Sequence, residues 1–378
     1  MRPLFSVLLA CLAVCSCWQG DSNQLKVDVR KALKSPVSSQ DLYSKADVIP
    51  LHYPGETSLG QEGRVVMDVA TDRFFLLDKE KDEILVFDWN GSFLTSLKSD
   101  GPIIDFYVYQ DRLLEVLTEK AILEYVIEDC SLSEVYMIQD NDITLKCLGR
   151  VNDDTISIIG FQSGDAYDCG YNIGKKRFSS VARPAPDYLT THSYTPASEV
   201  QNSRFFRCDD SVYSFQSHSG EIYGYTKDDF ILPAFVFDFG GCDLSVTNVQ
   251  KTTDRIYLAF ELEGADHVLV YNLDRKGYKA VRQTKEGAAF PLGVIYAGVN
   301  YYCCPSSHLG QYLPSEQGSE TDGLVIIRYS IWVQGRSAAG GIAPQLKKPA
   351  ISRRLFQLGC DVGLEPTTPR TTIWCSTN

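Results

Sequence analysis

Short runs of apolar residues, each ended by turn-forming residues, follow one another along most of this chain. One unit opens at Asp72 and holds the runs RFFLL, EILVF and SFL, with Asn90-Gly91 between the last two. An Asn-Gly pair accepts the left-handed backbone of a tight hairpin turn. The unit therefore predicts three consecutive antiparallel strands joined by short turns.

The same order of parts recurs, and most copies open with an aspartate. These residues are Asp72, Asp111, Asp154, Asp210 and Asp254, and a last copy starts near Gly298. They stand roughly 40 to 55 residues apart, close to the length of a four-stranded propeller blade. A helical repeat would instead place apolar residues at i, i+3 and i+4. The pattern predicts an all-β fold, a six-bladed β-propeller with four-stranded antiparallel blades over residues 45–332.

The segment Ala46–His52 precedes the first copy and predicts a short edge strand, a position in which Pro50 is tolerated. We expect this strand to pair with the strand at 324–330 and so to complete the last blade. Such pairing would close the ring and cover an open edge.

The first residues predict export. Arg2 precedes the apolar stretch 4–14, which has signal-peptide length and is too short to span a bilayer as a mature helix. The alternative is a buried N-terminal helix. No second apolar stretch of spanning length follows.

The end of this stretch predicts a lipid anchor. Val14-Cys15-Ser16-Cys17 resembles a bacterial lipobox, with cleavage after Ser16 and acylation of Cys17. Cys15 is the rival, but Val14 before it is bulkier than the usual small residue. We expect a signal peptide over 1–16 and an acylated Cys17 with its tether over 17–44, anchored to the membrane without spanning it.

Composition adds two constraints. The chain has 21 Tyr and 18 Phe, residue types that pack well on pleated sheets. Its formal net charge is -12, so binding to phosphates would gain nothing from counterion release. Nucleic acid is therefore not an expected partner.

Twelve cysteines are present, of which Cys11, Cys15 and Cys17 belong to the signal. No CxxC pair occurs, so a zinc ribbon has no support. An exported protein can hold disulfides, but the spacings are irregular and we expect mostly buried free thiols. Cys303 and Cys304 are neighbours on a predicted strand, so their side chains should point to opposite faces rather than pair.

Several motifs together resemble a known family. The lipobox is followed by Ile49-Pro50-Leu51, by the run FDWNGSFL at 87–94 and by Gly101-Pro102. Over residues 27–330 the chain is similar to the six-bladed β-propeller lipoproteins of gut Bacteroidota, whose NHL-like blades share the Phe-Asp-x-Asn-Gly element. The resemblance implies an envelope lipoprotein of unsettled activity and supplies no catalytic residues. Blades three and four depart most from the pattern.

Residues 333–378 differ from the rest of the chain. A segment of small residues leads to basic ones and then to the string VGLEPTTPRTTIWCS at 362–376. This string resembles one that recurs at the ends of unrelated translated sequences, where a reading frame crosses a transfer-RNA gene. We expect a disordered tail or an artefactual, frameshifted end, with no packed fold after Trp332.

No pattern predicts a catalytic residue or a metal site. The histidines show no HxxxH or HExxH spacing, and no GxSxG, P-loop or GxGxxG occurs. The histidines are His52, His192, His218, His267 and His308.

Three segments contain side chains that could bind a ligand, but each is also explained as an ordinary turn or hairpin. Asp88 with Asn90, and Asn272 with Asp274, suggest calcium loops but lack the terminal Glu of an EF-hand, and turn formation explains them. The segment 160–174 offers side chains for a sugar, with a blade hairpin as the ordinary alternative. Its residues are Asp165, Tyr167, Asp168 and Tyr171.

Two functions stay open. The first is a lipoprotein anchored in the cell envelope, at the outer membrane, whose propeller is a non-enzymatic binding or scaffold module without a cofactor. Its partner would be a glycan or an envelope protein. The second is a metal-dependent periplasmic hydrolase, lactonase or lyase, with carboxylates and an Asn around one calcium ion in the central channel. Asp72 and Asp254 recur once per blade, which favours a turn role over ligation.

Overall fold

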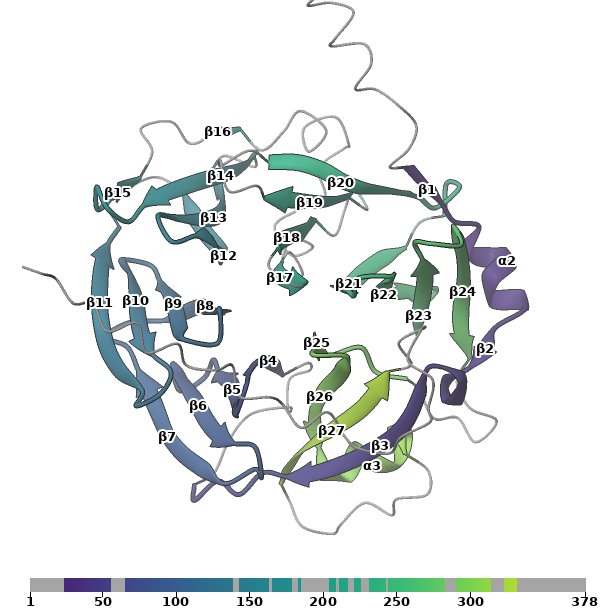
Figure 1. Cartoon of the computed structure of the whole chain (residues 1–378), viewed down its shortest axis with the longest axis horizontal. Helices are drawn as coiled ribbons and strands as arrows, with labels where there is room; N and C mark the ends of the chain where they lie inside the picture. The colour runs from purple at the N-terminus through teal and green to yellow at the C-terminus, as the bar shows by residue number, and fades with distance from the viewer. Residues whose placement is uncertain are drawn as a thin grey trace, which may run out of the picture. The chain divides into compact units, whose positions relative to one another are not determined.

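The computed structural model describes residues 24–55, 65–138, 143–162, 165–178, 183–184, 204–208, 211–216, 221–225, 231–242, 244–282, 290–313 and 323–331. The chain divides into two units after Val333, and all described residues belong to the first. There, six sheets are arranged around a common centre (Figure 1). The prediction of an all-β, six-bladed propeller is confirmed. The predicted signal over 1–16, Cys17 and the tail over 333–378 lie outside the described residues.

Each blade is an antiparallel sheet whose first strand lies nearest the centre (Figure 1). Blade 1 consists of β4 (Val66–Ala70), β5 (Arg73–Asp78), β6 (Glu83–Asp88) and β7 (Phe93–Lys98). Blade 2 consists of β8 (Ile103–Tyr109), β9 (Leu113–Thr118), β10 (Ala121–Val126) and β11 (Ser131–Met137). Blade 3 consists of β12 (Thr144–Asn152), β13 (Thr155–Gln162), β14 (Asp165–Asn172), β15 (Arg177–Phe178) and β16 (Arg183–Pro184).

The second half of the ring repeats this plan. Blade 4 consists of β17 (Arg204–Cys208), β18 (Ser211–Gln216), β19 (Glu221–Tyr225) and β20 (Ile231–Asp238). Blade 5 consists of β21 (Ser245–Lys251), β22 (Arg255–Leu262), β23 (Ala265–Asn272) and β24 (Gly277–Arg282). Blade 6 consists of β25 (Val294–Tyr296), β26 (Val299–Pro305), β27 (Leu324–Ile331) and β3 (Tyr43–Pro50), with η5 (Ser306–His308) and α3 (Leu309–Tyr312) after β26. Blades 3 and 4, whose sequences depart most from the repeat, are therefore present.

The ring is closed by the predicted strand pairing. β3 runs antiparallel to β27, with Pro50 opposite Val325 and Tyr43 opposite Ile331. The outermost strand of the last blade thus comes from the beginning of the chain, and the prediction is confirmed with a strand that starts earlier than Ala46. Pairing across the closure joins the two ends of the ring by backbone hydrogen bonds.

The segment before β3 is folded onto the ring, so the tether predicted over 17–44 is wrong for residues 24–44. β1 (Gln24–Lys26) adds a parallel strand to β20, and β2 (Val37–Ser38) adds one to β24. α2 (Val29–Lys34) lies between these two strands, and η2 (Ser39–Asp41) follows β2. The carboxylate of Asp28 accepts a hydrogen bond from the backbone N–H of Lys31 at 2.9 Å and caps α2. No helix among the described residues is long and apolar enough to cross a membrane.

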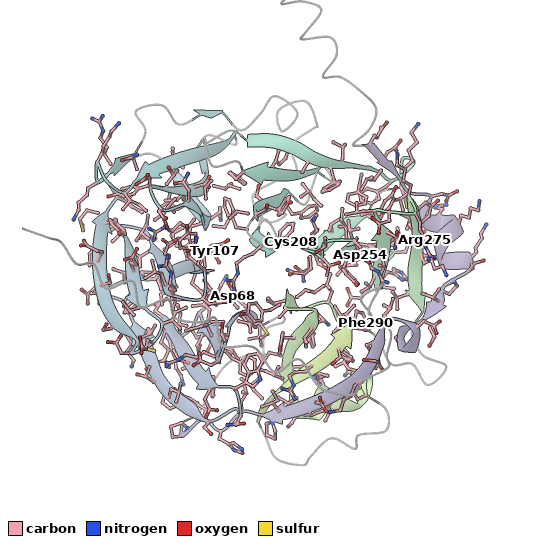
Figure 2. All side chains as sticks on the ribbon, viewed as in Figure 1. Asp68, Tyr107, Cys208, Asp254, Arg275 and Phe290 are labelled. Atoms are coloured by element: carbon pink, nitrogen blue, oxygen red, sulfur yellow. The ribbon has the colours of Figure 1, made fainter. Side chains whose placement is uncertain are left out.

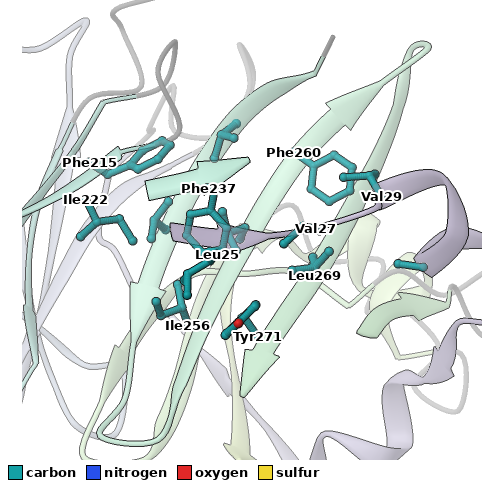
Figure 3. Close-up of a cluster of buried hydrophobic side chains, with 14 of the residues drawn as sticks. Leu25, Val27, Val29, Phe215, Ile222, Phe237, Ile256, Phe260, Leu269 and Tyr271 are labelled. Carbon is teal, nitrogen blue, oxygen red and sulfur yellow. The ribbon is translucent and has the colours of Figure 1, made fainter. Parts of the chain in front are cut away.

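Burial explains why this segment is ordered. Leu25, Val27 and Val29 alternate with polar residues and are at most 6% exposed. They pack in one apolar cluster with side chains of blades 4 and 5, among them Phe237 and Phe260 (Figure 3). A fully buried side chain of this size stabilises the fold by about 1.5–3 kcal/mol.

Apolar side chains from neighbouring blades form the core. In β5, Phe74 and Leu76 belong to the cluster shared with blade 6, whereas Phe75 and Leu77 belong to the cluster shared with blade 2. Successive residues of a strand point to opposite faces, so an inner strand whose two faces are both covered by neighbouring blades can bury apolar side chains on both faces. This double burial is why the blade strands appear as continuous apolar runs.

The turns have the predicted chemistry. The carboxylate of Asp88 accepts hydrogen bonds from the backbone N–H groups of Asn90 at 2.9 Å and Ser92 at 2.8 Å, and Gly91 has a φ of +85°. The side-chain oxygen of Asn272 accepts from the backbone N–H of Arg275 at 2.8 Å. The turn interpretation of these two segments is confirmed.

Candidate functional site in the central channel

The innermost strands of five blades line a cavity at the centre of the ring. Its volume is ≈ 40 Å³, room for a few water-sized groups. Its polar lining residues are Asp68, Asp105, Tyr107, Arg207, Asn248, Gln250 and Tyr296, and its aromatic ones are Phe106, Phe205, Phe206 and Phe215. Asp68 and Tyr107 lie at the inner ends of their blades (Figure 2).

Arg207, on the innermost strand of blade 4, reaches across the centre to blades 1 and 2. Its Nη2 donates to the backbone carbonyl oxygen of Val69 at 2.6 Å and lies 3.8 Å from a carboxylate oxygen of Asp68. Its Nη1 donates to the carboxylate of Asp111 at 3.3 Å. The guanidinium carbon also lies 5.6 Å from the ring centroid of Tyr296, within reach of a cation–π attraction.

Asp111 connects blade 2 to three other blades. Its carboxylate accepts hydrogen bonds from the hydroxyl of Tyr296 at 2.7 Å and from that of Thr71 at 3.1 Å, in addition to the one from Arg207. The residue has a φ of +55° in the β8–β9 turn, a left-handed backbone that costs a non-glycine residue about 1–2 kcal/mol. The cross-blade contacts offset this cost.

These contacts shift the ionisation of the groups involved. Burial acts to lower the pKa of Arg207, but the nearby carboxylates, Asp68 foremost, outweigh it and raise that pKa above its usual value. Burial and then the hydrogen bond to Asp111 raise the pKa of Tyr296 to about 12. Burial likewise raises the pKa of Tyr107 well above its usual value. The channel therefore holds a charged guanidinium and neutral phenols.

Other polar channel residues bind the next blade along the ring. Asp68 accepts from the backbone N–H of Val108 at 3.1 Å, and Asp105 accepts from that of Leu148 at 3.2 Å. On the opposite side, the Gln250 side-chain oxygen accepts from the backbone N–H of Ile295 at 3.0 Å. The Asn248 amide donates to the carbonyl oxygens of Leu292 at 3.0 Å and Gly293 at 2.8 Å. The side chains that line the channel thus hold neighbouring blades together.

A second charged cluster is buried between blades 2 and 3. Nη1 of Arg150 donates to Glu115 at 2.8 Å and to Glu124 at 2.7 Å, and the hydroxyl of Tyr136 donates to Glu124 at 3.2 Å. Glu115 is 0% exposed. Burial raises the pKa of Glu115 to about 7, against the opposing pull of the Arg150 guanidinium. Two carboxylates thus share one arginine.

The residues singled out in the sequence lie apart from the channel or have structural roles. Asp254 accepts a hydrogen bond from the Thr252 hydroxyl at 3.0 Å within its own turn. Tyr171 is 0% exposed, and residues 160–162 and 165–172 belong to the paired strands β13 and β14, with a turn after them. The side chains of residues 161–168 lie outside the described set. His52 and His308 are exposed and His267 is partly buried, whereas His192 and His218 are outside the described residues.

Arg207, Asp68 and the residues of the buried cluster were not singled out in the sequence, and Asp111 was named only as the opening residue of a repeat. Arg207 follows two phenylalanines in a strand, and Glu115 stands between Leu114 and Val116. A charge directly beside apolar residues within a strand was the available signal, because a buried charge needs a partner. The partners come from other blades, so their identity required the ring.

The chemistry that this channel supports is limited by what its groups already bind. No cluster of three or more His, Cys, Asp or Glu residues suited to a metal ion occurs in the described part of the chain. Asp68 and Asp111 are neutralised by Arg207, and Asp68 and Asp105 also accept backbone N–H groups. A cation placed there would have to compete with these bonds, so the donor set does not fit a calcium centre.

Six blades of antiparallel strands around a central channel define a six-bladed β-propeller. The family described as 6-bladed beta-propeller matches residues 19–273, and the chain belongs to that family. A comparison with curated proteins found no match.

Solved structures from Bacteroides have the same fold. A Bacteroides fragilis protein described as a candidate exported protein is 11% identical with a TM-score of 0.59, covering 82% of this chain and 99% of that one. A DUF4221 family member from Bacteroides vulgatus is 8% identical with a TM-score of 0.51, covering 78% and 99%. Virginiamycin B lyase from Staphylococcus aureus is 8% identical with a TM-score of 0.42, covering 68% and 81%, too slight a likeness to carry an argument. At these identities the likeness shows the fold alone.

Proposed function

We propose that this protein is an exported lipoprotein, anchored in the outer membrane through Cys17, whose propeller serves as a non-enzymatic binding or scaffold module. The apolar stretch after Arg2 and the Val14–Cys17 lipobox support export and acylation. The description of the Bacteroides fragilis neighbour as a candidate exported protein is consistent with export of this chain.

The observation that carries the non-enzymatic role is the engagement of the channel side chains. In a propeller hydrolase or lyase of the metal-dependent kind, several channel carboxylates and an amide converge on one ion. Here Asp68, Asp105 and Asn248 bind backbone groups of the following blade, and Asp111 binds Arg207. The channel polar groups therefore contribute to ring rigidity, and a rigid ring is suited to presenting its loops to a partner.

The partner class that we propose is a glycan or another envelope protein, bound by loops at one face of the ring. The test is thermal unfolding of the full-length protein in detergent, with added calcium, EDTA, or host and dietary glycans. A ligand that binds only the folded state increases the free energy of unfolding, by about 2.7 kcal/mol at one hundred times its Kd. The melting temperature rises as a result. Stabilisation by one glycan class supports the proposal. A calcium-dependent rise that EDTA reverses overturns it in favour of the metal-dependent hydrolase or lyase.

The anchor is tested separately. Cells that produce the protein are fed a fatty acid carrying an alkyne, and the label on the wild type is compared with that on Cys17→Ala and Cys15→Ala. Loss of label and of membrane fractionation in Cys17→Ala alone supports acylation of Cys17. Loss in Cys15→Ala alone assigns the anchor to the rival cysteine.

A further inference from the structure

One polar group that lines the channel cavity is buried without a partner. In the part of the chain that the structure describes, the hydroxyl of Tyr107 makes no hydrogen bond, and the residue is 2% exposed. Tyr107 lies on β8, the innermost strand of blade 2, near the centre of the ring (Figure 2). A buried hydroxyl without a partner is destabilising and calls for an explanation. A group that enters the cavity would gain a hydrogen bond that the protein itself leaves unmade.

Two further residues of the cavity lining have unused donors. A guanidinium has five N–H donors, and Arg207 uses two of them, on groups of blades 1 and 2. A side-chain amide has two N–H donors, and Gln250 uses one of them, in a long bond of 3.4 Å. Both residues line the same cavity as Tyr107. A ligand atom that accepts hydrogen bonds can therefore be held there.

The cavity also offers acceptors and is open to solvent. An ionised carboxylate has about four lone-pair sites, and Asp68 uses two of them to accept backbone N–H groups. The side chains of Arg207 and Asp68 are 20% and 15% exposed, so a small group can reach them from outside. The site thus matches a ligand group that both accepts and donates.

Charge favours a neutral ligand. Arg207 lies 3.8 Å from Asp68 and 3.3 Å from Asp111, so the guanidinium is already matched by two carboxylates. A ligand carboxylate would add a third negative charge beside these two, and a ligand ammonium would approach the guanidinium. A neutral hydroxyl avoids both repulsions, and it is both a donor and an acceptor.

Size limits how much of a ligand can enter. The cavity volume is ≈ 40 Å³, and one water molecule occupies about 30 Å³ in the liquid. One carbon with its hydroxyl fits this space, whereas a whole sugar ring does not. The aromatic side chains of the lining supply apolar contact for the carbon; they are Phe106, Phe205, Phe206 and Phe215.

We propose that the channel cavity binds the hydroxymethyl group of a neutral hexose, while the sugar ring stays outside the cavity. The sugar hydroxyl bonds to the hydroxyl of Tyr107 and accepts from Arg207. This inference rests on the proposed glycan-binding function and adds one recognition element to it. The loops at the face of the ring contact the rest of the glycan, and Tyr107 selects for one hydroxyl.

The test is calorimetric titration of the full-length protein in detergent with the methyl glycosides of glucose, galactose and mannose. Each is compared with its 6-deoxy counterpart, which lacks only the hydroxyl of the hydroxymethyl group. In the wild type, loss of this hydroxyl should weaken binding by about tenfold or more, because the donors of the cavity are left unpaired. In Tyr107→Phe, the two members of a pair should differ by less than about twofold.

Tyr329→Phe is the matched control. The hydroxyl of Tyr329 is likewise buried without a hydrogen-bond partner among the described residues, but the residue lies on β27, outside the cavity lining. This variant should keep the affinities of the wild type within about twofold, since distant sites act independently. Each substitution removes only an unpartnered oxygen, so the melting temperature without sugar should not fall. That measurement separates a binding defect from a folding defect.

The outcomes distinguish this inference from the proposed function. A preference for the 6-hydroxyl that Tyr107→Phe abolishes and Tyr329→Phe keeps supports the inference. Equal binding of both members of a pair by the wild type, or a preference that survives in Tyr107→Phe, overturns the inference and leaves glycan binding by the loops intact. Absence of binding for every glycoside overturns both the inference and the glycan as partner, and it assigns the cavity to ordered water only.

Discussion

Replacing the buried acid Glu115 by glutamine should remove a pH dependence from the stability of the ring. The pKa of Glu115 rises from 4.5 to about 7 in the folded protein, chiefly because burial disfavours the carboxylate. The folded state therefore keeps a proton that the unfolded state releases between these values. Stability from this group is fully present below pH 4.5 and is lost as the pH rises to 7. A shift of about 2.5 units corresponds to about 3 kcal/mol.

Urea unfolding of the wild type and of Glu115→Gln, at pH 5 and at pH 8, measures this effect. At pH 5 the neutral acid and the amide occupy the site similarly, and Arg150 keeps its bond to Glu124. At pH 8 the wild type buries an extra carboxylate that the variant lacks. From pH 5 to pH 8, the unfolding free energy of the variant minus that of the wild type should therefore increase by about 2.5 kcal/mol.

Glu134→Gln is the matched control, because Glu134 is an exposed carboxylate on the outer strand of the same blade. The difference in unfolding free energy between Glu134→Gln and the wild type should change by less than about 0.5 kcal/mol over the same pH range. A difference between Glu115→Gln and wild type that stays constant within that margin would refute the reasoning. It would mean that Arg150 holds Glu115 ionised despite burial.

Three further changes test other parts of the fold by denaturant unfolding. Arg207→Met should lower the free energy of unfolding by about 3–5 kcal/mol, because it leaves the channel carboxylates without their cation. A decrease of less than about 1 kcal/mol would show that water replaces the guanidinium. Gly91→Ala should lower the free energy of unfolding more than Gly264→Ala does. Both glycines have a positive φ, but a Cβ on Gly91 would lie 2.0 Å from the carbonyl oxygen of Pro50, whereas Gly264 faces open space. Equal losses of stability would contradict the close approach of Gly91 to Pro50. Val27→Ala should lower the free energy of unfolding by about 1–3 kcal/mol. An unchanged stability would favour the interpretation of residues 24–44 as a tether.

Local repetition made the fold predictable from the sequence. Each blade contains its own strands and turns within one stretch of chain, so the unit that begins at Asp72 could be recognised again at Asp254. The pairing of β3 with β27 followed from the need to close a ring. β1 and β2 were missed because they are very short and their partners are far along the chain. The alternation of Leu25, Val27 and Val29 was the available signal.

The candidate site could not be predicted in the same way. Arg207 is positioned by its own blade, but Asp68, Asp111 and Tyr296 approach it from three others. No spacing in the sequence encodes that meeting, because it depends on how far each blade is rotated around the centre. A charge directly beside apolar residues in a strand indicates that a buried partner is needed without indicating which residue provides it.

Blade 2 shows how the charges of such a fold must be balanced. Tyr107, Glu115, Glu124 and Glu134 lie directly opposite one another across its four strands, from the channel to the outer edge. Three carboxyl groups in adjacent positions on one face would repel one another. Lys176 neutralises the outermost, Arg150 pairs with both Glu124 and Glu115, and the raised pKa of about 7 keeps a proton on Glu115 at lower pH. The row is tolerated because each position has either a cation or a proton, so the protonation of Glu115 is part of the packing between blades 2 and 3.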